Sequence, residues 1–149
     1  MKKLLFFGLI AFTVAACKKD KFETVPKVEI TSFGPDEVTK GQLFRLTANV
    51  TDKEGDLQDS LILVRKRYTN DILFRTDTTK YSLKEFGIPN EQTFELSLTF
   101  GYGEDIPGTI FYSIQESIDR GVTYGIIITD KAKNKSTYVE SKKILLKKV

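Results

Sequence analysis

Few residues of this 149-residue chain could do chemistry, and most of those that could carry oxygen. The chain has no histidine and a single cysteine, Cys17. Cysteine–histidine and serine–histidine catalysis are therefore excluded, as are zinc sites of the usual cysteine and histidine kind. No glycine-rich loop follows a strand pattern and opens a helix, so a phosphate-binding loop is not expected either.

Oxygen-bearing side chains gather in two polar turns. One turn contains Asp52, Glu54 and Asp56, and the other contains Asp130 and Asn134. Ca²⁺ takes about six to eight hard oxygen ligands, so these five side chains form a candidate calcium site if the two turns meet. Tight turns also use Asp, Asn and Gly for local hydrogen bonds and left-handed backbone. We expect this second role, with no metal or other cofactor bound, and calcium is the alternative.

Two acidic pairs raise the question of enzymatic activity. They are residues 104–105, and Glu116 with Asp119. A glycosidase needs two carboxylates that face one sugar across a cleft. Nothing in a chain this short indicates such a cleft, so we expect no enzyme, with a small carboxylate-based hydrolase as a remote alternative.

Tyr102 is a candidate for a binding patch. It lies between Gly101 and Gly103, where a strand pattern gives way to a polar loop. Loops carry a large share of functional residues, and tyrosine offers a flat apolar surface with a polar tip. The alternative is that this tyrosine caps the edge of the core.

The residues around Cys17 indicate export from the cytoplasm. Lys2 and Lys3 precede an apolar run over residues 4–14, and small residues occupy the two positions before the cysteine. This is the pattern of a secretory signal peptide. The run is shorter than the roughly 20 residues that span a bilayer. An ordinary signal peptide with an incidental cysteine, or a short anchor helix, is the alternative.

The tetrad Val14-Ala15-Ala16-Cys17 resembles the bacterial lipobox. The resemblance implies a cleaved lipoprotein signal peptide over residues 1–16 and diacylglycerol on the thiol of Cys17, often with a further acyl chain on the new amino group. Two or three chains hold a protein stably at a membrane. We therefore expect a lipid-anchored protein of the cell envelope, at the outer membrane, with residues 17–26 as its tether.

Charge argues against a nucleic-acid partner. The formal net charge of the whole chain is +3, and loss of Lys2 and Lys3 with the signal peptide would reduce it to +1. Nucleic-acid-binding domains are strongly basic.

The chain also has no second cysteine, so no intramolecular disulfide can stabilise it.

Period-two alternation dominates from Lys27 onward and predicts an all-β domain over residues 27–149. It is clearest over residues 44–51, 93–100 and 122–129. Shorter strands are expected at residues 28–30, 60–68, 72–74 and 110–114, with a closing strand at residues 136–146 and one helical turn at residues 82–85. Short strands at this spacing favour an antiparallel sandwich of seven to nine strands. Its expected core includes Leu46, Val50, Leu63, Leu96, Leu98, Ile126 and Ile128.

Two segments resemble turns of bacterial immunoglobulin-like domains. Residues 50–57 resemble the B-strand exit and B–C turn, and residues 128–136 resemble the F–G turn, with Lys133 in place of the usual glycine. The resemblance implies an immunoglobulin-like sandwich in which these turns lie at one end. The first strand starts at that same end, so the acidic turns should be membrane-proximal. A lipobox followed by one such domain is similar to small lipoproteins of Bacteroidetes-type bacteria.

The sequence thus predicts a cell-envelope lipoprotein with a non-enzymatic domain. The domain would bind an envelope protein or glycan, or act as a spacer. The alternative is an accessory structural subunit of an outer-membrane nutrient-uptake assembly.

Overall fold

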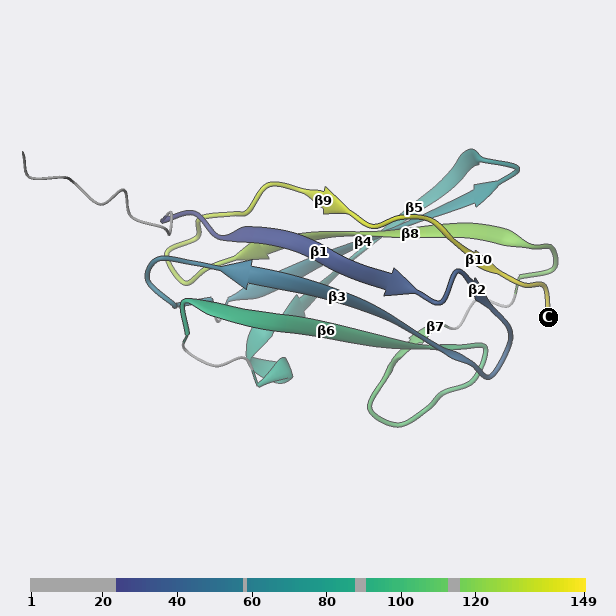
Figure 1. The fold of residues 1–149 in the computed structure, drawn as a ribbon, viewed down its shortest axis with the longest axis horizontal. Coiled ribbons are helices and arrows are strands. Elements are labelled where there is room, and N and C mark those ends of the chain that lie inside the picture. The colour runs from purple at the N-terminus through teal and green to yellow at the C-terminus, as the bar shows by residue number, and fades with distance from the viewer. Residues whose placement is uncertain (1–23, 58, 88–90, 113–115) are drawn as a thin grey trace, which may run out of the picture.

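Two β-sheets pack face to face (Figure 1). The computed structural model describes residues 24–57, 59–87, 91–112 and 116–149. The first sheet has the strand order β1 (Lys27–Gly34), β3 (Leu43–Thr51), β6 (Thr93–Tyr102) and β7 (Ile110–Tyr112). The second has the order β2 (Glu37–Val38), β10 (Ile144–Leu146), β8 (Arg120–Thr129), β4 (Ser60–Thr69) and β5 (Ile72–Ser82), and β9 (Val139–Glu140) also pairs with β8.

The connectivity is that of an immunoglobulin-like sandwich, as predicted. After β3 the chain crosses to the second sheet at β4, returns to the first sheet at β6 and crosses again between β7 and β8. In immunoglobulin-like domains, strands A, B and E form one sheet and strands C, F and G the other. Here β1, β3 and β6 correspond to the first group, and β4, β8 and β10 to the second. The strand β5 extends the second sheet as a C′ strand does.

The alternation in β3 and β6 produces the interior. Paired positions such as Leu46 with Leu98 and Ala48 with Leu96 point inward and are buried, because successive side chains of a strand point to opposite faces. The predicted core is confirmed, since the exposed fraction is 4% or less for each of its members, which are Leu46, Val50, Leu63, Leu96, Leu98, Ile126 and Ile128.

Strand number and direction depart in detail from the prediction of seven to nine antiparallel strands. The described residues form ten strands, several of them only two or three residues long. Two pairs are parallel, β6 with β7 and β2 with β10. The expected helical turn is a 3-10 turn at Leu83–Phe86, which ends at Gly87 in the left-handed conformation. None of the described residues forms a helix long and apolar enough to cross a membrane.

The predicted closing strand at residues 136–146 is broken into β9 and β10. Serine hydroxyls take over part of the pairing with β8: Oγ of Ser136 accepts from the backbone N–H of Ile128, and Oγ of Ser141 accepts from that of Tyr124, both at 3.0 Å. A hydroxyl can satisfy a strand donor where a regular ladder is interrupted. The alternation of apolar and polar residues in this segment does not indicate that serine hydroxyls replace part of the backbone pairing.

The strand β5 is much longer than the three residues predicted at positions 72–74. It continues to Ser82 and pairs with β4 along its length. Asn70 and Asp71, with φ of 47° and 66°, form the two-residue turn that suits a twisted hairpin. The β4–β5 hairpin carries this turn beyond the body of the sandwich, at the upper right of Figure 1.

Candidate metal centre

Two turns meet at one end of the sandwich. The turn after β3 contains Asp52 and Asp56, and the turn after β8 contains Asp130. The backbone N–H of Lys131 donates a hydrogen bond of 3.2 Å to the carbonyl oxygen of Asp56, so the two turns are joined directly. Because β3 and β8 belong to different sheets, this contact lies where the two layers of the sandwich close on each other.

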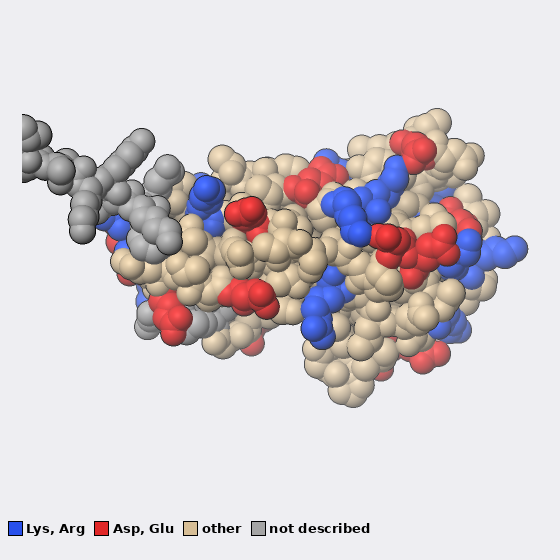
Figure 2. Space-filling view, in the orientation of Figure 1, with Lys and Arg blue, Asp and Glu red and all other residues tan. Residues whose placement is uncertain are grey.

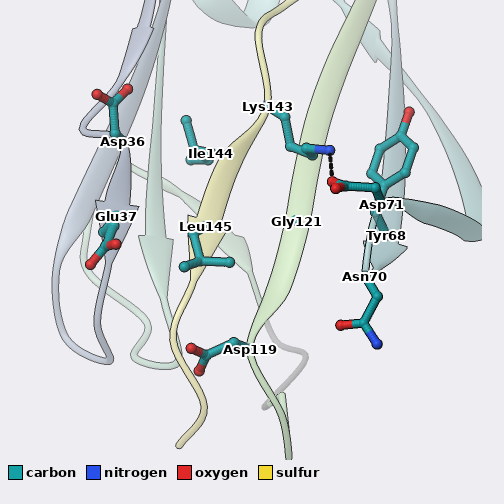
Figure 3. Close-up of a pocket in the computed structure, with 10 residues that line it drawn as sticks. All are labelled: Asp36, Glu37, Tyr68, Asn70, Asp71, Asp119, Gly121, Lys143, Ile144 and Leu145. Atoms are coloured by element: carbon teal, nitrogen blue, oxygen red, sulfur yellow. Dashed lines mark hydrogen bonds and ion pairs between the residues drawn. The ribbon is translucent and has the colours of Figure 1, made fainter.

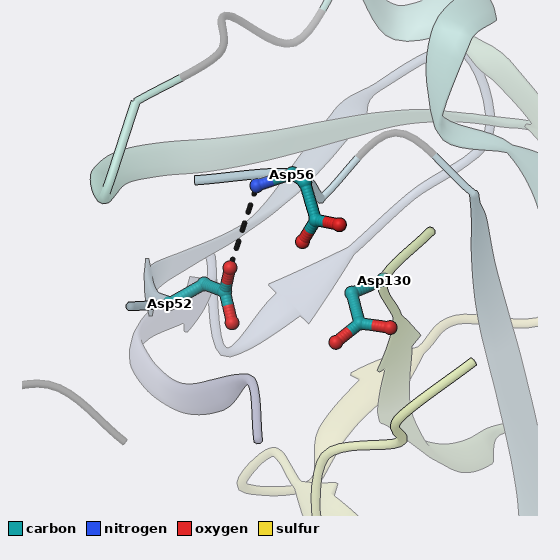
Figure 4. Close-up of side chains that lie close together, drawn as sticks. All are labelled: Asp52, Asp56 and Asp130. Carbon is teal, nitrogen blue, oxygen red and sulfur yellow. Dashed lines mark hydrogen bonds between the residues drawn. The ribbon is translucent and has the colours of Figure 1, made fainter. Parts of the chain in front are cut away.

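Three carboxylates converge across this contact (Figure 4). One oxygen from each of Asp52, Asp56 and Asp130 lies within 4.8 Å of the other two. Asp52 and Asp130 are buried, with exposed fractions of 0% and 1%, and Asp56 is half-buried. We call these three side chains the acidic trio.

Backbone hydrogen bonds hold two members of the acidic trio in place. Oδ2 of Asp52 accepts from the N–H of Gly55 at 2.9 Å and of Asp56 at 3.4 Å. Asp130 accepts two bonds of 2.8 Å from Asn134, one from its backbone N–H and one from its side-chain Nδ2. The two bonds to Asp52 favour the charged form of its carboxylate.

Two oxygens of the trio lack partners among the described residues. Oδ1 of Asp52 and Oδ1 of Asp56 are buried atoms that accept no hydrogen bond from the described residues. Across the same part of the chain, no ion pair involves Asp52, Asp56 or Asp130. Two unit charges 4.8 Å apart repel by about 3.5 kcal/mol at an effective dielectric constant of about 20.

The electrostatics of Asp52 reflect this crowding. Burial raises the pKa of Asp52, and the charges of Asp56 and Glu54 add to the increase. The backbone hydrogen bonds from Asp56 and Gly55 act in the opposite direction without cancelling it. Within the part of the chain that the structure describes, no ion pair offsets the charge of the trio.

The two other predicted ligands lie outside this convergence. Glu54 belongs to the same turn as Asp52, but its side chain is exposed. Asn134 uses its amide to hold Asp130. The sequence identified the right turns, but a local pattern does not show which side chains of a turn face inward. The arrangement can therefore offer a hard cation three carboxylates rather than the five side chains predicted.

The first strand starts at the end of the molecule that carries the acidic trio. Lys27 opens β1 and pairs with Thr51, which directly precedes Asp52. The last strand, β10, pairs with the opposite end of β8, where Leu146 faces Arg120. Cys17, the signal peptide predicted at residues 1–16 and most of the predicted tether lie outside the described residues.

Tyr102 does not form an exposed patch, so that prediction was wrong. The strand β6 continues through it, and its side chain has an exposed fraction of 0%. Its hydroxyl donates a 2.8 Å hydrogen bond to the carbonyl of Lys147, and its ring packs edge-on against Tyr112. The glycines that suggested a loop flank the end of β6, where Gly103 adopts a φ of 71° to begin the turn.

The far end of the sandwich, which we call the distal end, carries an open groove of about 410 Å³ (Figure 3). It lies between β10 and the β4–β5 hairpin, and Lys143 reaches across it to pair with Asp71. Further ion pairs join Lys142 to Asp36 and Lys147 to Asp119. Acidic and basic side chains accordingly lie side by side over this end of the molecule in Figure 2. The sequence analysis did not identify this end.

Comparison with known proteins adds no function to this description. No protein-family model and no curated protein matches the chain. Among solved structures, the sporulation control protein Spo0M from Bacillus subtilis matches 84% of the chain at 14% identity with a TM-score of 0.45, and the chain spans 50% of that protein. The CARDB domain of PF1109 from Pyrococcus furiosus, solved in complex with di-metal ions, matches 86% of the chain and 91% of its own length at 15% identity, with a TM-score of 0.31. The C-terminal domain of wzt matches 83% of the chain and 70% of its own length at 15% identity, with a TM-score of 0.36.

Proposed function

We propose that this protein is a lipid-anchored protein of the cell envelope that presents the distal end of its sandwich to another envelope protein. The leader and Cys17 support the anchor, as argued from the sequence. A tether over residues 17–26 could extend roughly 30 Å from the lipid. The domain then begins at Lys27, beside the acidic trio. On this proposal the distal end faces away from the membrane.

The observation that carries this proposal is an apolar tip at the distal end. Ile72, Leu73 and Phe74 follow the hairpin turn in succession, with exposed fractions of 72%, 47% and 46%. Tyr68 of the same hairpin pairs with Gly121, near the start of β8, so the tip lies at the end opposite Asp130. Contiguous exposed apolar residues mark interaction sites in soluble domains.

The chemistry of the hairpin tip favours a protein partner over a glycan. Sugars are commonly bound on the flat face of an aromatic ring with a polar edge. The ring of Phe74 is instead covered by guanidinium groups, with Arg120 4.3 Å and Arg67 5.1 Å from its centroid. The most exposed surface is that of Ile72, an aliphatic side chain suited to an apolar pocket on a protein.

A non-catalytic role is part of the proposal. Glu116 and Asp119 are carboxylates that a hydrolase would need free. Glu116 forms ion pairs with Arg67 and Arg120, and Asp119 pairs with Lys147. This engagement supports a role in stabilising the domain. Membership of an outer-membrane uptake assembly would be one form of the proposed function.

Fatty-acid labelling tests the anchor. Because Cys17 is the only cysteine, Cys17→Ser should abolish thiol-linked acylation and leave the protein unprocessed by the lipoprotein pathway. Wild-type protein in the same cells provides the control. Unchanged labelling of the variant would contradict the anchor.

Cross-linking followed by pull-down from solubilised envelope tests the binding surface. The double variant Ile72→Ser and Leu73→Ser should lose the partner that wild-type lipoprotein captures. Phe86→Ser is the matched control, because Phe86 is also an exposed apolar residue (37%) but follows β5 at the end near Asp130. Equal capture by the double variant and wild type would contradict the assigned surface.

A further inference from the structure

We propose that Asp52, Asp56 and Asp130 bind a single Ca²⁺ ion between the two turns. The inference does not depend on the lipid anchor or on the distal surface. It follows from the arrangement of the three carboxylates and from the oxygens they leave without partners.

The unpartnered oxygens indicate a positively charged ligand. Buried polar atoms are nearly always satisfied, and those left over in a native structure call for an explanation such as an ion. Oδ1 of Asp52 is such an atom on a side chain with no exposed surface, and Oδ1 of Asp56 is a second. Figure 4 shows the carboxylates of both turns facing a common space. A cation in that space would satisfy both orphan oxygens and remove the repulsion within the trio.

The distances suit one ion. Oxygens that bind the same Ca²⁺ each lie about 2.4 Å from it, so two of them can be at most about 4.8 Å apart. One oxygen from each member of the acidic trio meets this limit. Water and carbonyl oxygens would complete the six to eight ligands that Ca²⁺ usually takes.

The ligand chemistry favours Ca²⁺ over other common ions. Zinc prefers cysteine and histidine, and this chain has no histidine and one cysteine far from the trio in sequence. Mg²⁺ requires near-ideal octahedral geometry at about 2.0–2.1 Å, keeps most of its waters and is rarely held by a cage of protein ligands. Three carboxylates from two turns offer the adaptable, all-oxygen shell that Ca²⁺ accepts.

Bound Ca²⁺ would fasten the two sheets at this end. Asp52 and Asp56 follow β3 in the first sheet, and Asp130 follows β8 in the second. The ion would add to the backbone hydrogen bond from Lys131 to Asp56 that joins these turns. Ligand that binds only the folded state raises stability by mass action.

Thermal unfolding of the full-length protein, purified in detergent and treated with EDTA, tests the proposal. Sites in extracellular modules bind Ca²⁺ with dissociation constants of about 10⁻⁴–10⁻³ M, so about 5 mM CaCl₂ is enough. We expect the wild-type midpoint to rise by about 3–6 °C in CaCl₂ and by less in MgCl₂. Calorimetric titration with CaCl₂ should give one site per chain.

Asp56→Asn is the diagnostic variant. It removes a ligand charge while keeping the shape, and no hydrogen bond among the described residues uses the Asp56 side chain. In EDTA this variant should unfold at a higher temperature than wild type, because one repelling charge is gone. In CaCl₂ the order should reverse, because the wild type gains the ion. Glu54→Gln is the matched control: it removes an exposed carboxylate of the same turn and should keep the calcium response.

Three outcomes would overturn the proposal. An equal midpoint for wild type in CaCl₂ and in EDTA would leave the carboxylates with their turn roles alone. A full calcium response in Asp56→Asn would place the ion elsewhere. An equal rise with MgCl₂ would exclude a site selective for Ca²⁺. If Asp52→Asn or Asp130→Asn fails to fold, Asp56→Asn still decides between these outcomes.

Discussion

The hydroxyl of Tyr112 donates a 3.0 Å hydrogen bond to Oε1 of Glu116, and both side chains are buried. The same oxygen accepts from Arg67 at 3.3 Å, and the other carboxylate oxygen accepts from Arg120 at 3.3 Å. Tyr112 lies on β7 in the first sheet and Arg67 on β4 in the second, so one carboxylate links the two layers. Burial raises the pKa of Tyr112, and the charge of Glu116 raises it further, which keeps the hydroxyl a donor.

Removal of the buried charge of Glu116 should be strongly destabilising. Glu116→Gln would leave the buried guanidinium of Arg67 with only its longer contact to Asp77, at 3.7 Å, and breaking a buried ion pair by removing one partner typically costs about 3–5 kcal/mol. Urea unfolding measures the loss. Glu104→Gln, which removes an exposed carboxylate, should change the free energy of unfolding by less than about 0.5 kcal/mol. Equal midpoints for the two variants would show that the buried pair contributes little.

The interior of the sandwich should respond to loss of volume. Leu96 is buried and pairs with Ala48 across β3 and β6. Leu96→Ala should lower the free energy of unfolding by about 2–5 kcal/mol, because it removes apolar contacts and leaves a cavity. Thr99→Ala, on the outer face of the same strand, loses one exposed hydrogen bond with Arg45 and should be nearly neutral. The two melting temperatures, compared by circular dichroism, check the prediction.

A glycine at position 133, in the turn after β8, should raise the free energy of unfolding. Lys133 adopts a φ of 73°, which is unfavourable for a side chain with a Cβ atom. Lys133→Gly should therefore stabilise the protein by about 1 kcal/mol, although it loses the exposed ion pair with Asp59. Lys133→Ala keeps the strain and loses the same ion pair, so it should be neutral or slightly destabilising. A Lys133→Gly variant no more stable than Lys133→Ala would rule out this explanation.

Acid should weaken a network on the outer face of the second sheet. Burial acts to raise the pKa of Glu140, but hydrogen bonds from Lys66, Thr123 and Tyr138 outweigh it and lower the pKa. A lowered folded-state pKa means that the stabilisation is present above the unfolded-state value of about 4.3 and is lost as the pH falls below it.

Glu140→Gln tests this pH dependence. Between pH 7 and pH 3, the free energy of unfolding should fall less in Glu140→Gln than in wild type, by about 0.5–1 kcal/mol. Glu29→Gln removes an exposed carboxylate on β1 and should keep the wild-type dependence. Parallel pH profiles for wild type and Glu140→Gln would contradict the prediction.

Strict alternation was enough to predict the centre of each sheet. Leu46 and Leu98 could be placed in the core because a half-buried strand imposes its period on the sequence. The length of β5 could not be predicted, because residues 75–80 are polar on both faces and resemble a loop. They form a strand because β4 supplies backbone partners along their whole length. The pairing of β5 with β4 is a tertiary interaction, which the local sequence pattern does not predict.

The acidic turns were likewise predicted only in part. Turn chemistry and the resemblance to immunoglobulin-like domains were sufficient to bring Asp52 and Asp130 to the same end. Only the folded structure shows that Asp56 faces inward while Glu54 faces solvent. The buried partnership of Glu116 with Arg67 was also missed, because 49 residues separate them and no local signal relates the two.

The position of Lys27 at the start of β1 has a mechanical consequence. The strands β1 and β3 run along the long axis of the molecule (Figure 1), and β1 is hydrogen-bonded to β3 from Lys27 to Gly34. In an anchored protein, a partner that pulled on the distal hairpin would stretch the domain along this axis. Antiparallel hydrogen bonds lie perpendicular to their strands, so such a force would shear the β1–β3 ladder as a unit instead of opening it one bond at a time. The domain would then resist tension between membrane and partner far better than it would resist peeling from its side.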